Sequence, residues 1–337
     1  MTKFGHLPTI IILAHKRVDH LVQVVESLAG ARGIEHHRVV GIVDGNWPAS
    51  MDIIRSTLSP EVLVEMTHED GLQPRNRISK NLQVGLRLGF EYFSAPYCVV
   101  LEDDIVVSSD FLNFVSSVSL SHRRQPSFRA INGFSRLPPH PRHRASDYVR
   151  LNYGAGWGWA LPKKSYGQVK KLLERSGDHH WDGLIEPYLR TGYVVNPLRS
   201  RVVNIGFDGT GAHTGTALHQ QIGREMKTSL VGPDEWSSTP ANIREAAVPF
   251  LWREDAIAIG SLNVFYRGMA FGAGRMLMMI SAVIFQFSNS RWAVAIGPIR
   301  KLKRALVSGT LPFLASRAAR KSSKLARLKP FKLGRLG

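Results

Sequence analysis

The chain has 337 residues, 44% of them hydrophobic and 21% charged, which is ordinary for a globular protein. Its single cysteine, Cys98, excludes a disulfide within the chain and favours a reducing compartment. The apolar stretch 9–14 is too short for the core of a signal peptide and lacks a cleavage site, so we interpret it as a first strand.

Residues 8–93 alternate between strand and helix patterns. Strands are expected at 9–14, 39–43 and 62–66, helices at about 18–29, 50–57 and 76–93, and a further strand at 97–101. This alternation predicts βαβ units and an α/β fold with a mostly parallel sheet flanked by helices. Residues 122–155 are typical of loops and short strands, and two more helices are expected at about 163–175 and 181–190.

The strand at 97–101 runs directly into three acidic residues, Glu102, Asp103 and Asp104. A strand buried in a parallel sheet cannot also bury three unpaired carboxylates, so we expect them at the rim beyond the carboxyl ends of the strands, where open α/β sheets bind ligands. Side chains alternate along a strand, which predicts Glu102 and Asp104 on one side and Asp103 on the other. Such a cluster can hold a divalent cation, sugar hydroxyls or both; the alternative is three solvated acids.

The net charge of +18 is concentrated at the end of the chain. Residues 256–337 carry 15 lysines and arginines and no acid, and subtracting 15 from 18 leaves +3 for residues 1–255. Apolar stretches separate the basic clusters of this tail, and the longest, 276–287, is shorter than the roughly 20 residues of a spanning helix. The pattern favours amphipathic helices on an anionic membrane surface. We therefore predict a cytoplasmic protein bound peripherally to the inner face of a membrane.

Four segments within residues 8–215 form a recognisable set: 14–17 (AHKR), 43–45 (VDG), 99–112 (VVLEDDIVVSSDFL), and 156–160 (GWGWA) followed by 181–182 (WD). Together they resemble the GT-A glycosyltransferases, and more closely the N-acetylglucosaminyltransferase I family, which adds GlcNAc from UDP-GlcNAc with inversion. The resemblance implies a Rossmann-like GT-A domain over 1–255, with a nucleotide-binding half (1–121) and an acceptor half (122–255). The basic helical extension after 256 has no counterpart in the family.

The resemblance also implies roles for single residues. Asp104 would bind Mn²⁺ or Mg²⁺, which neutralises the charge that builds on the departing diphosphate. The remaining donor-binding positions would be Arg17 and Asp44 at the nucleotide, Glu102 and Asp103 at the ribose and sugar hydroxyls, and Asn81, which stands where the animal enzymes have a histidine. The alternatives are a solvated loop charge for Arg17 and an ordinary turn for Asp44.

Asp182 is the candidate general base, because an inverting transfer needs a carboxylate within hydrogen-bond reach of the acceptor hydroxyl. An aspartate at the start of a helix is also a common N-cap, and Glu186, one turn later on the same face, is the alternative base. Gly183 follows Asp182 where the family has a second acid.

The sequence therefore predicts a metal-dependent inverting glycosyltransferase that uses a nucleotide sugar, UDP-linked by the resemblance, and a glycan or lipid-linked acceptor. The alternative is a noncatalytic membrane- or nucleic-acid-binding protein on a GT-A-like scaffold. No specific nucleic acid is expected, because the apolar stretches of the tail would have no use on a duplex.

Overall fold

The computed structural model describes residues 6–135, 144, 146–152, 154, 156–175, 181–206 and 243–246. The predicted basic tail, 256–337, lies outside the described residues. Among those that are described, no helix combines the length and the apolar character needed to cross a membrane.

The strands are β1 Thr9–Ala14, β2 Arg38–Asp44, β3 Val62–Met66, β4 Tyr97–Glu102, β5 Ile105–Val107, β6 Phe128–Asn132, β7 Asp147–Leu151, β8 Trp159–Pro162, β9 Tyr193–Pro197, β10 Val202–Asn204 and β11 Arg244–Glu245. The α-helices are α1 Val18–Ala29, α2 Pro48–Leu58, α3 Pro74–Arg87, α4 Phe111–His122, α5 Lys163–Glu174 and α6 Trp181–Leu189. Two short helical turns, η1 Ile34–His36 and the π-helical η2 Leu88–Tyr92, complete the described elements.

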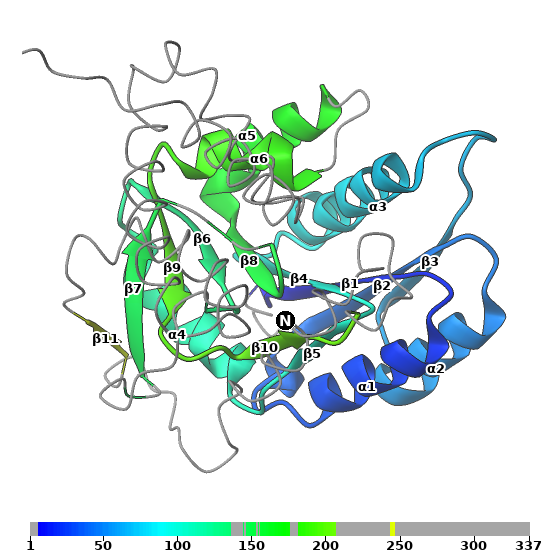
Figure 1. The fold of residues 1–337 in the computed structure, drawn as a ribbon, viewed down its shortest axis with the longest axis horizontal. Helices are drawn as coiled ribbons and strands as arrows, with labels where there is room; N and C mark the ends of the chain where they lie inside the picture. The colour runs from blue at the N-terminus through cyan, green and yellow to red at the C-terminus, as the bar shows by residue number, and fades with distance from the viewer. Residues whose placement is uncertain are drawn as a thin grey trace, which may run out of the picture. The chain divides into compact units, whose positions relative to one another are not determined.

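One sheet of nine described strands runs in the order β11-β7-β9-β6-β8-β4-β1-β2-β3 (Figure 1). Strands β4, β1, β2 and β3 are parallel to one another, whereas β8 pairs antiparallel with both β4 and β6. A separate antiparallel ribbon joins β5 and β10. The predicted mixed, mostly parallel sheet is confirmed.

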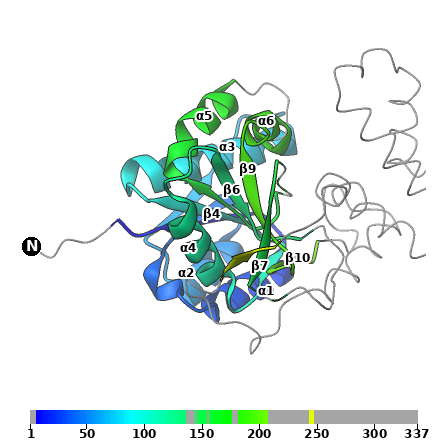
Figure 2. The ribbon, with the colours of Figure 1, turned by 90° about the vertical axis from the view of Figure 1, so that its left-hand side faces the viewer.

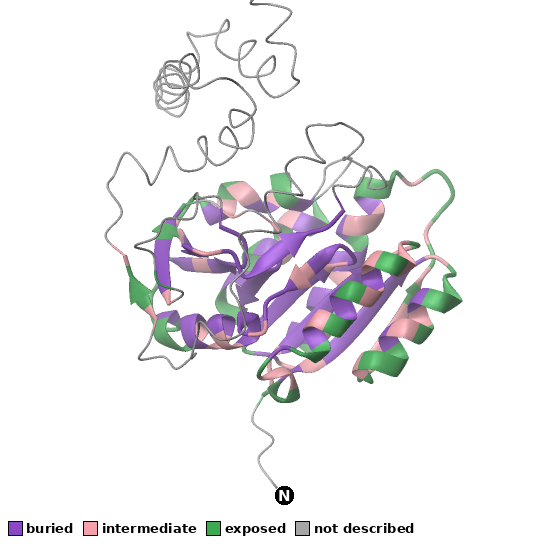
Figure 3. Cartoon of the chain, turned by 60° about the horizontal axis from the view of Figure 1, so that its bottom comes forward, coloured by how far each residue is buried: buried purple, intermediate pink, exposed green. Residues whose placement is uncertain are grey.

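Helices cover both faces of the sheet, as Figures 1 and 2 show. Ile10 and Ile12 of β1 belong to the apolar cluster that contains residues of α1, α2 and α4, whereas Ile11 belongs to the cluster that contains residues of α3, α5 and α6. Every residue of β1 is buried for this reason (Figure 3), which is the pattern of a strand covered on both sides.

The helices can approach the sheet closely where a glycine removes the side chain. A Cβ atom at Gly85 of α3 would collide with the Ile11 side chain of β1. This close approach places α3 directly over the strand whose end forms the candidate site.

Candidate functional site

The carboxyl ends of β1, β2 and β4 meet at one edge of the sheet, because the three strands are parallel and adjacent. In register, Leu13 of β1 faces Glu102 of β4, and Ala14 faces Val43 of β2. The residues that follow these strands therefore converge, as the sequence predicts. They include Arg17, Asp44 and the acids after β4.

Arg17 lies between the two acids that follow β4. Its guanidinium donates a hydrogen bond to Asp103, and its Nη1 is 2.9 Å from Oδ2 of Asp104. The other carboxylate oxygen of Asp103 accepts a hydrogen bond of 3.1 Å from the backbone N–H of His15. Burial alone would lower the pKa of Arg17, but the charges of Asp104 and Asp103 outweigh it and raise the pKa, so the guanidinium stays charged.

Both acids reach Arg17 because β4 ends at Glu102 and a turn follows. The alternation expected along a continuous strand is therefore wrong at this point: Asp103 and Asp104 face the same cation. Asp103 and Asp104 are only 4% and 7% exposed, so the alternative of solvated acids is wrong for these two. The pair of buried carboxylates is instead matched by the partly buried guanidinium of Arg17.

Gly206, the second residue beyond the end of β10, covers this ion pair. A Cβ atom there would collide with Oδ2 of Asp104 and would lie 2.8 Å from Nη1 of Arg17. The backbone N–H of Ile205 donates to the carbonyl of Asp104 at 2.8 Å, which fixes the segment in place. Only a residue without a side chain fits at position 206 in this arrangement.

Asp104 has one oxygen with no assigned partner. Its Oδ1 is buried and accepts no hydrogen bond from the described residues. Burial raises the pKa of Asp104, against the opposing effect of Arg17. A divalent cation would satisfy this oxygen and favour the ionised carboxylate.

This donor set fits a cation that takes most of its ligands from a substrate. Within the described part of the chain, no group of three or more His, Cys, Asp or Glu side chains could hold a metal ion by itself. One carboxylate oxygen together with two phosphate oxygens and waters is a normal way to hold Mg²⁺. Asp104 is the residue that would provide the protein's oxygen.

Asp44, at the end of β2, lies among three basic side chains, those of His68, Arg77 and His15. Nε2 of His68 is 3.3 Å from Oδ1 of Asp44 and 2.9 Å from Oδ1 of Asn81, so this nitrogen carries the proton. Arg77 Nε is 3.6 Å from Oδ2 of Asp44, and the His15 ring lies 2.7 Å from the Asp44 carbonyl. The structure thus brings together the two predicted donor-binding residues Asp44 and Asn81, with His68 between them.

Glu102 and Asp182 extend the acidic cluster toward α6. Glu102 is partly buried at the end of β4. Burial raises its pKa to about 8, and the charges of Asp104 and Asp103, and to a smaller extent Asp182, add to the effect. Asp182 therefore lies within electrostatic reach of Glu102, although the two residues are 80 positions apart in the sequence (182 − 102 = 80).

The two candidate bases on α6 have different surroundings. Asp182 is exposed in the first turn, where its Oδ1 accepts a 2.6 Å hydrogen bond from the backbone N–H of Gly183. Glu186, in contrast, is held by Arg190, whose Nη2 is 2.6 Å from Oε1 of Glu186. This i,i+4 pair occupies one oxygen of Glu186.

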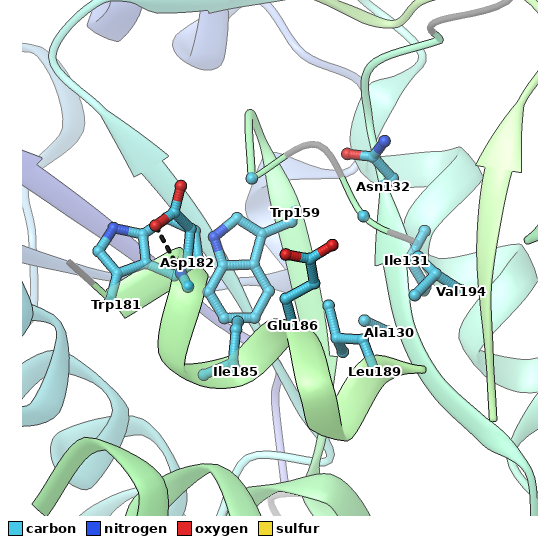
Figure 4. A pocket seen from close by; sticks show the side chains of 13 residues that line it. Ala130, Ile131, Asn132, Trp159, Trp181, Asp182, Ile185, Glu186, Leu189 and Val194 are labelled. Atoms are coloured by element: carbon cyan, nitrogen blue, oxygen red, sulfur yellow. Dashed lines mark hydrogen bonds between the residues drawn. The ribbon is translucent and has the colours of Figure 1, made fainter. Parts of the chain in front are cut away.

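A pocket of about 130 Å³ lies against these two carboxylates (Figure 4). Its walls come from α6 and from β6, β8 and β9, on the sheet face that α3, α5 and α6 cover. Trp159 forms one wall, and its ring stacks on that of Trp181 with centroids 5.1 Å apart and an interplanar angle of 16°. The glycine-aromatic segment 156–160 and the Trp181-Asp182 pair, which the resemblance joined, therefore meet in space.

No protein-family model matches the chain. The chain is similar to the crystal structure of S. aureus TarS 1–349, with 12% identity over 85% of this chain and 73% of that chain and a TM-score of 0.43. It is also similar to the same protein in complex with UDP-GlcNAc, with 11% identity over 87% and 80% and a TM-score of 0.42. A third similar structure is the mannosyltransferase PcManGT from Pyrobaculum calidifontis in complex with GDP-Man and Mn²⁺, with 13% identity over 84% and 86% and a TM-score of 0.39.

Two features of this edge were not predicted from the sequence: the presence of His68, and the pairing of the predicted site residue Arg17 with two acids. His68 is two positions beyond the end of β3, so the rule that polar residues after parallel strands converge could have found it. The role of Arg17 as the partner of Asp103 and Asp104 has no such signal, because the contact joins residues more than 80 positions apart. Only the folded chain shows it.

Proposed function

We propose that this chain is a glycosyltransferase that moves a sugar from a nucleotide-diphosphate donor to an acceptor hydroxyl. The observation that carries the proposal is the buried Asp103–Arg17–Asp104 cluster, in which one oxygen of Asp104 accepts no hydrogen bond from the described residues. It lies at the carboxyl ends of parallel strands, beside Asp44 and within electrostatic reach of Glu102.

Asp104 would hold Mn²⁺ or Mg²⁺, and the bound ion would neutralise charge on the departing diphosphate. Arg17, already positioned at the same carboxylates, supplies a second positive charge for the phosphates. Asp44 would accept a hydrogen bond from the N–H of a uracil base, the role that the resemblance implies, and we propose UDP as the donor nucleotide on that ground. Its side chain is held for this by His68 and Arg77.

The acceptor side of the reaction is proposed to use Asp182. An inverting transfer needs a base on the face opposite the diphosphate, and Asp182 takes the proton of the acceptor hydroxyl as that oxygen attacks the sugar. Glu186 is the alternative base; its Oε1 is paired with the charged side chain of Arg190, whereas Oδ1 of Asp182 accepts from a neutral backbone N–H. Glu102, whose raised pKa keeps it protonated near pH 7, can donate a hydrogen bond to a hydroxyl of the transferred sugar, for which GlcNAc is our candidate.

Nucleotide-sugar binding tests this proposal directly. The full chain is melted with a panel of UDP- and GDP-sugars, each in Mn²⁺ and in chelator. We expect at least one UDP-sugar to raise the melting temperature in Mn²⁺ only, and Asp104→Asn to remove the shift. Asp52→Asn is the matched control, because Asp52 is an exposed aspartate of α2 paired with Arg55. A panel with no metal-dependent shift would contradict the proposal.

We also propose that residues 256–337 hold the enzyme on the anionic inner face of a membrane, close to a glycan or lipid-linked acceptor. The 15 basic residues of this segment and its interleaved apolar stretches support the proposal. Liposome flotation tests it: the full chain should float with vesicles that contain phosphatidylserine and not with neutral vesicles. Salt-sensitive retention on DNA without lipid binding would support the alternative of a nucleic-acid partner instead.

A further inference from the structure

The pocket beside Asp182 combines an apolar floor with two carboxylates. Figure 4 shows Ala130, Ile131, Leu189 and Val194 close together, with Glu186 between them and Trp159 and with Asp182 on the other side of Trp159. The volume of about 130 Å³ is that of about four water molecules, each of which takes about 30 Å³ in the liquid. The lining mixes apolar side chains with the polar Asn132, Asp182 and Glu186, so the pocket is suited to a ligand group that carries both polar and apolar atoms.

Two buried polar atoms on the pocket wall have no partner among the described residues. The first is Oδ1 of Asn132, a residue that is 1% exposed. Nδ2 of Asn132 donates to the carbonyl of Phe134 at 2.7 Å and to Oδ1 of Asn196 at 2.8 Å, which fixes the orientation of the amide and leaves its oxygen as an acceptor. A buried polar group without a hydrogen bond is unfavourable, so a ligand that donates to this oxygen would be stabilised.

The second atom is Nε1 of Trp159, a residue that is 4% exposed. An indole N–H is a donor only, so it requires an acceptor on the ligand. The pocket is therefore complementary to a ligand group with one hydrogen-bond donor, one hydrogen-bond acceptor and a small apolar part next to Ile131 and Leu189. A secondary amide that carries a methyl group, such as the acetamido substituent of an N-acetylated sugar, has all three.

The position of the pocket assigns it to the acceptor. Asp182 and Glu186 line it, whereas Glu102, Asp103 and Asp104 do not. A general base contacts the acceptor hydroxyl, so a pocket that contains the base and excludes the donor-binding acids lies on the acceptor side. We propose that this pocket binds the acetamido group of an N-acetylated sugar acceptor, an inference that rests on the proposed function for its assignment to the acceptor.

Direct binding of simple glycosides tests the inference without turnover. The full chain is titrated by NMR with methyl N-acetylglucosaminide and methyl N-acetylgalactosaminide, and with methyl glucoside and methyl galactoside, which carry a hydroxyl in place of the acetamido group. We expect the N-acetylated glycosides to bind about tenfold more tightly, as a methyl group and two hydrogen bonds add to the contact. Equal binding of both kinds of glycoside would show that only water fills the pocket and would overturn the inference.

Trp159→Phe removes the indole N–H and keeps an aromatic ring against Trp181. It should weaken the N-acetylated glycosides about fivefold and leave methyl glucoside unchanged, because only the acetamido oxygen uses the donor. Trp157→Phe is the control, since Trp157 contacts Phe134 and does not line the pocket. Ala130→Val, which narrows the pocket floor without touching a polar atom, should have the same selective effect and covers the case in which Trp159→Phe fails to fold.

A second titration, with UDP-GlcNAc and UDP-glucose in Mn²⁺, tests whether the pocket binds the acetamido group of the donor or that of the acceptor. The acceptor assignment is overturned if the wild type prefers UDP-GlcNAc to UDP-glucose, Trp159→Phe loses this preference, and the N-acetylated and plain methyl glycosides bind equally well to the wild type. If nucleotide sugars bind and are turned over, but Trp159→Phe changes neither the preference between the two UDP-sugars nor that between the N-acetylated and plain methyl glycosides, the inference fails and the proposed function stands. If no nucleotide sugar binds, the proposed function fails, whereas selective glycoside binding still supports an acetamido site.

Discussion

Replacement of Arg17 by glutamine should destabilise the fold and at the same time increase its response to a divalent cation. The guanidinium pairs with both Asp103 and Asp104, whose side chains are 6% and 10% exposed, while its own side chain is 20% exposed. Removal of one partner from a buried pair costs about 3–5 kcal/mol, and the partial exposure of Arg17 favours the lower end, about 3 kcal/mol. For a chain of this size, a loss of about 3 kcal/mol lowers the melting temperature by roughly 6–12 °C.

The assay is urea unfolding of the full chain in chelator and in millimolar Mn²⁺. In chelator, Arg17→Gln should unfold at lower urea with an unchanged slope, because stability and not compactness is altered. Mn²⁺ should restore more stability to Arg17→Gln than to the wild type, since the two acids no longer share a built-in cation. Arg55→Gln, which removes an exposed i,i+3 pair with Asp52, should change stability by less than about 1 kcal/mol. Wild-type stability of Arg17→Gln in chelator, with no added response to Mn²⁺, would refute this reasoning.

Five further substitutions test neighbouring parts of the account. The pKa of Glu102 is raised to about 8 in the folded state, so the folded protein keeps this proton while the unfolded chain loses it above pH 4.5, and the free energy of unfolding falls as the pH rises through this window. In urea unfolding, the stability of Glu102→Gln relative to the wild type should therefore increase by about 1–3 kcal/mol between pH 5 and pH 8.5. A difference that stays constant with pH would contradict the assignment. Asp182→Asn should lower kcat on the order of 100-fold or more in a transfer assay while Glu186→Gln stays within a few-fold, and the reverse order would make Glu186 the base. Arg201 is fully buried, with its guanidinium 4.0 Å from the Phe114 ring and 3.3 Å from Asp110. Arg201→Met should lower the free energy of unfolding by about 3–5 kcal/mol, because Asp110 then keeps a buried charge without its partner. An unchanged melting temperature in calorimetry would contradict this expectation. Gly206→Ala should weaken Mn²⁺ binding measured by calorimetry, since its Cβ would collide with Asp104, and unchanged affinity would show that the segment moves freely.

The order of strands and helices could be predicted from the sequence because each signal is local. The expected strand at 9–14 is β1, and the expected helix at 163–175 is α5 with one residue fewer. Buried parallel strands leave apolar runs, and helices leave periodic ones, so neither needs knowledge of distant residues. The helix at Phe111–His122 was not predicted; it is apolar on several sides and lacks a clear period.

The convergence of Asp44 and the acids after β4 could also be predicted, since it follows from parallel strands ending at one edge. The pairing of those acids could not. Whether Asp103 and Asp104 face solvent, a metal or an arginine depends on where β4 ends and on which side chain of the α1 start reaches them. Arg201 is a similar case, because an arginine in a sequence carries no sign that folding will bury it beside Asp110.

Turnover of a nucleotide sugar by the full chain tests the central claim most directly. Release of the nucleoside diphosphate from UDP-sugars is measured in Mn²⁺ and in chelator, for the wild type, Asp104→Asn and the control Asp52→Asn. The account predicts release that requires the metal, is lost on the order of 100-fold in Asp104→Asn and is kept in Asp52→Asn. Release that is equal in chelator, or that survives in Asp104→Asn, would contradict the assignment of this carboxylate to the departing diphosphate.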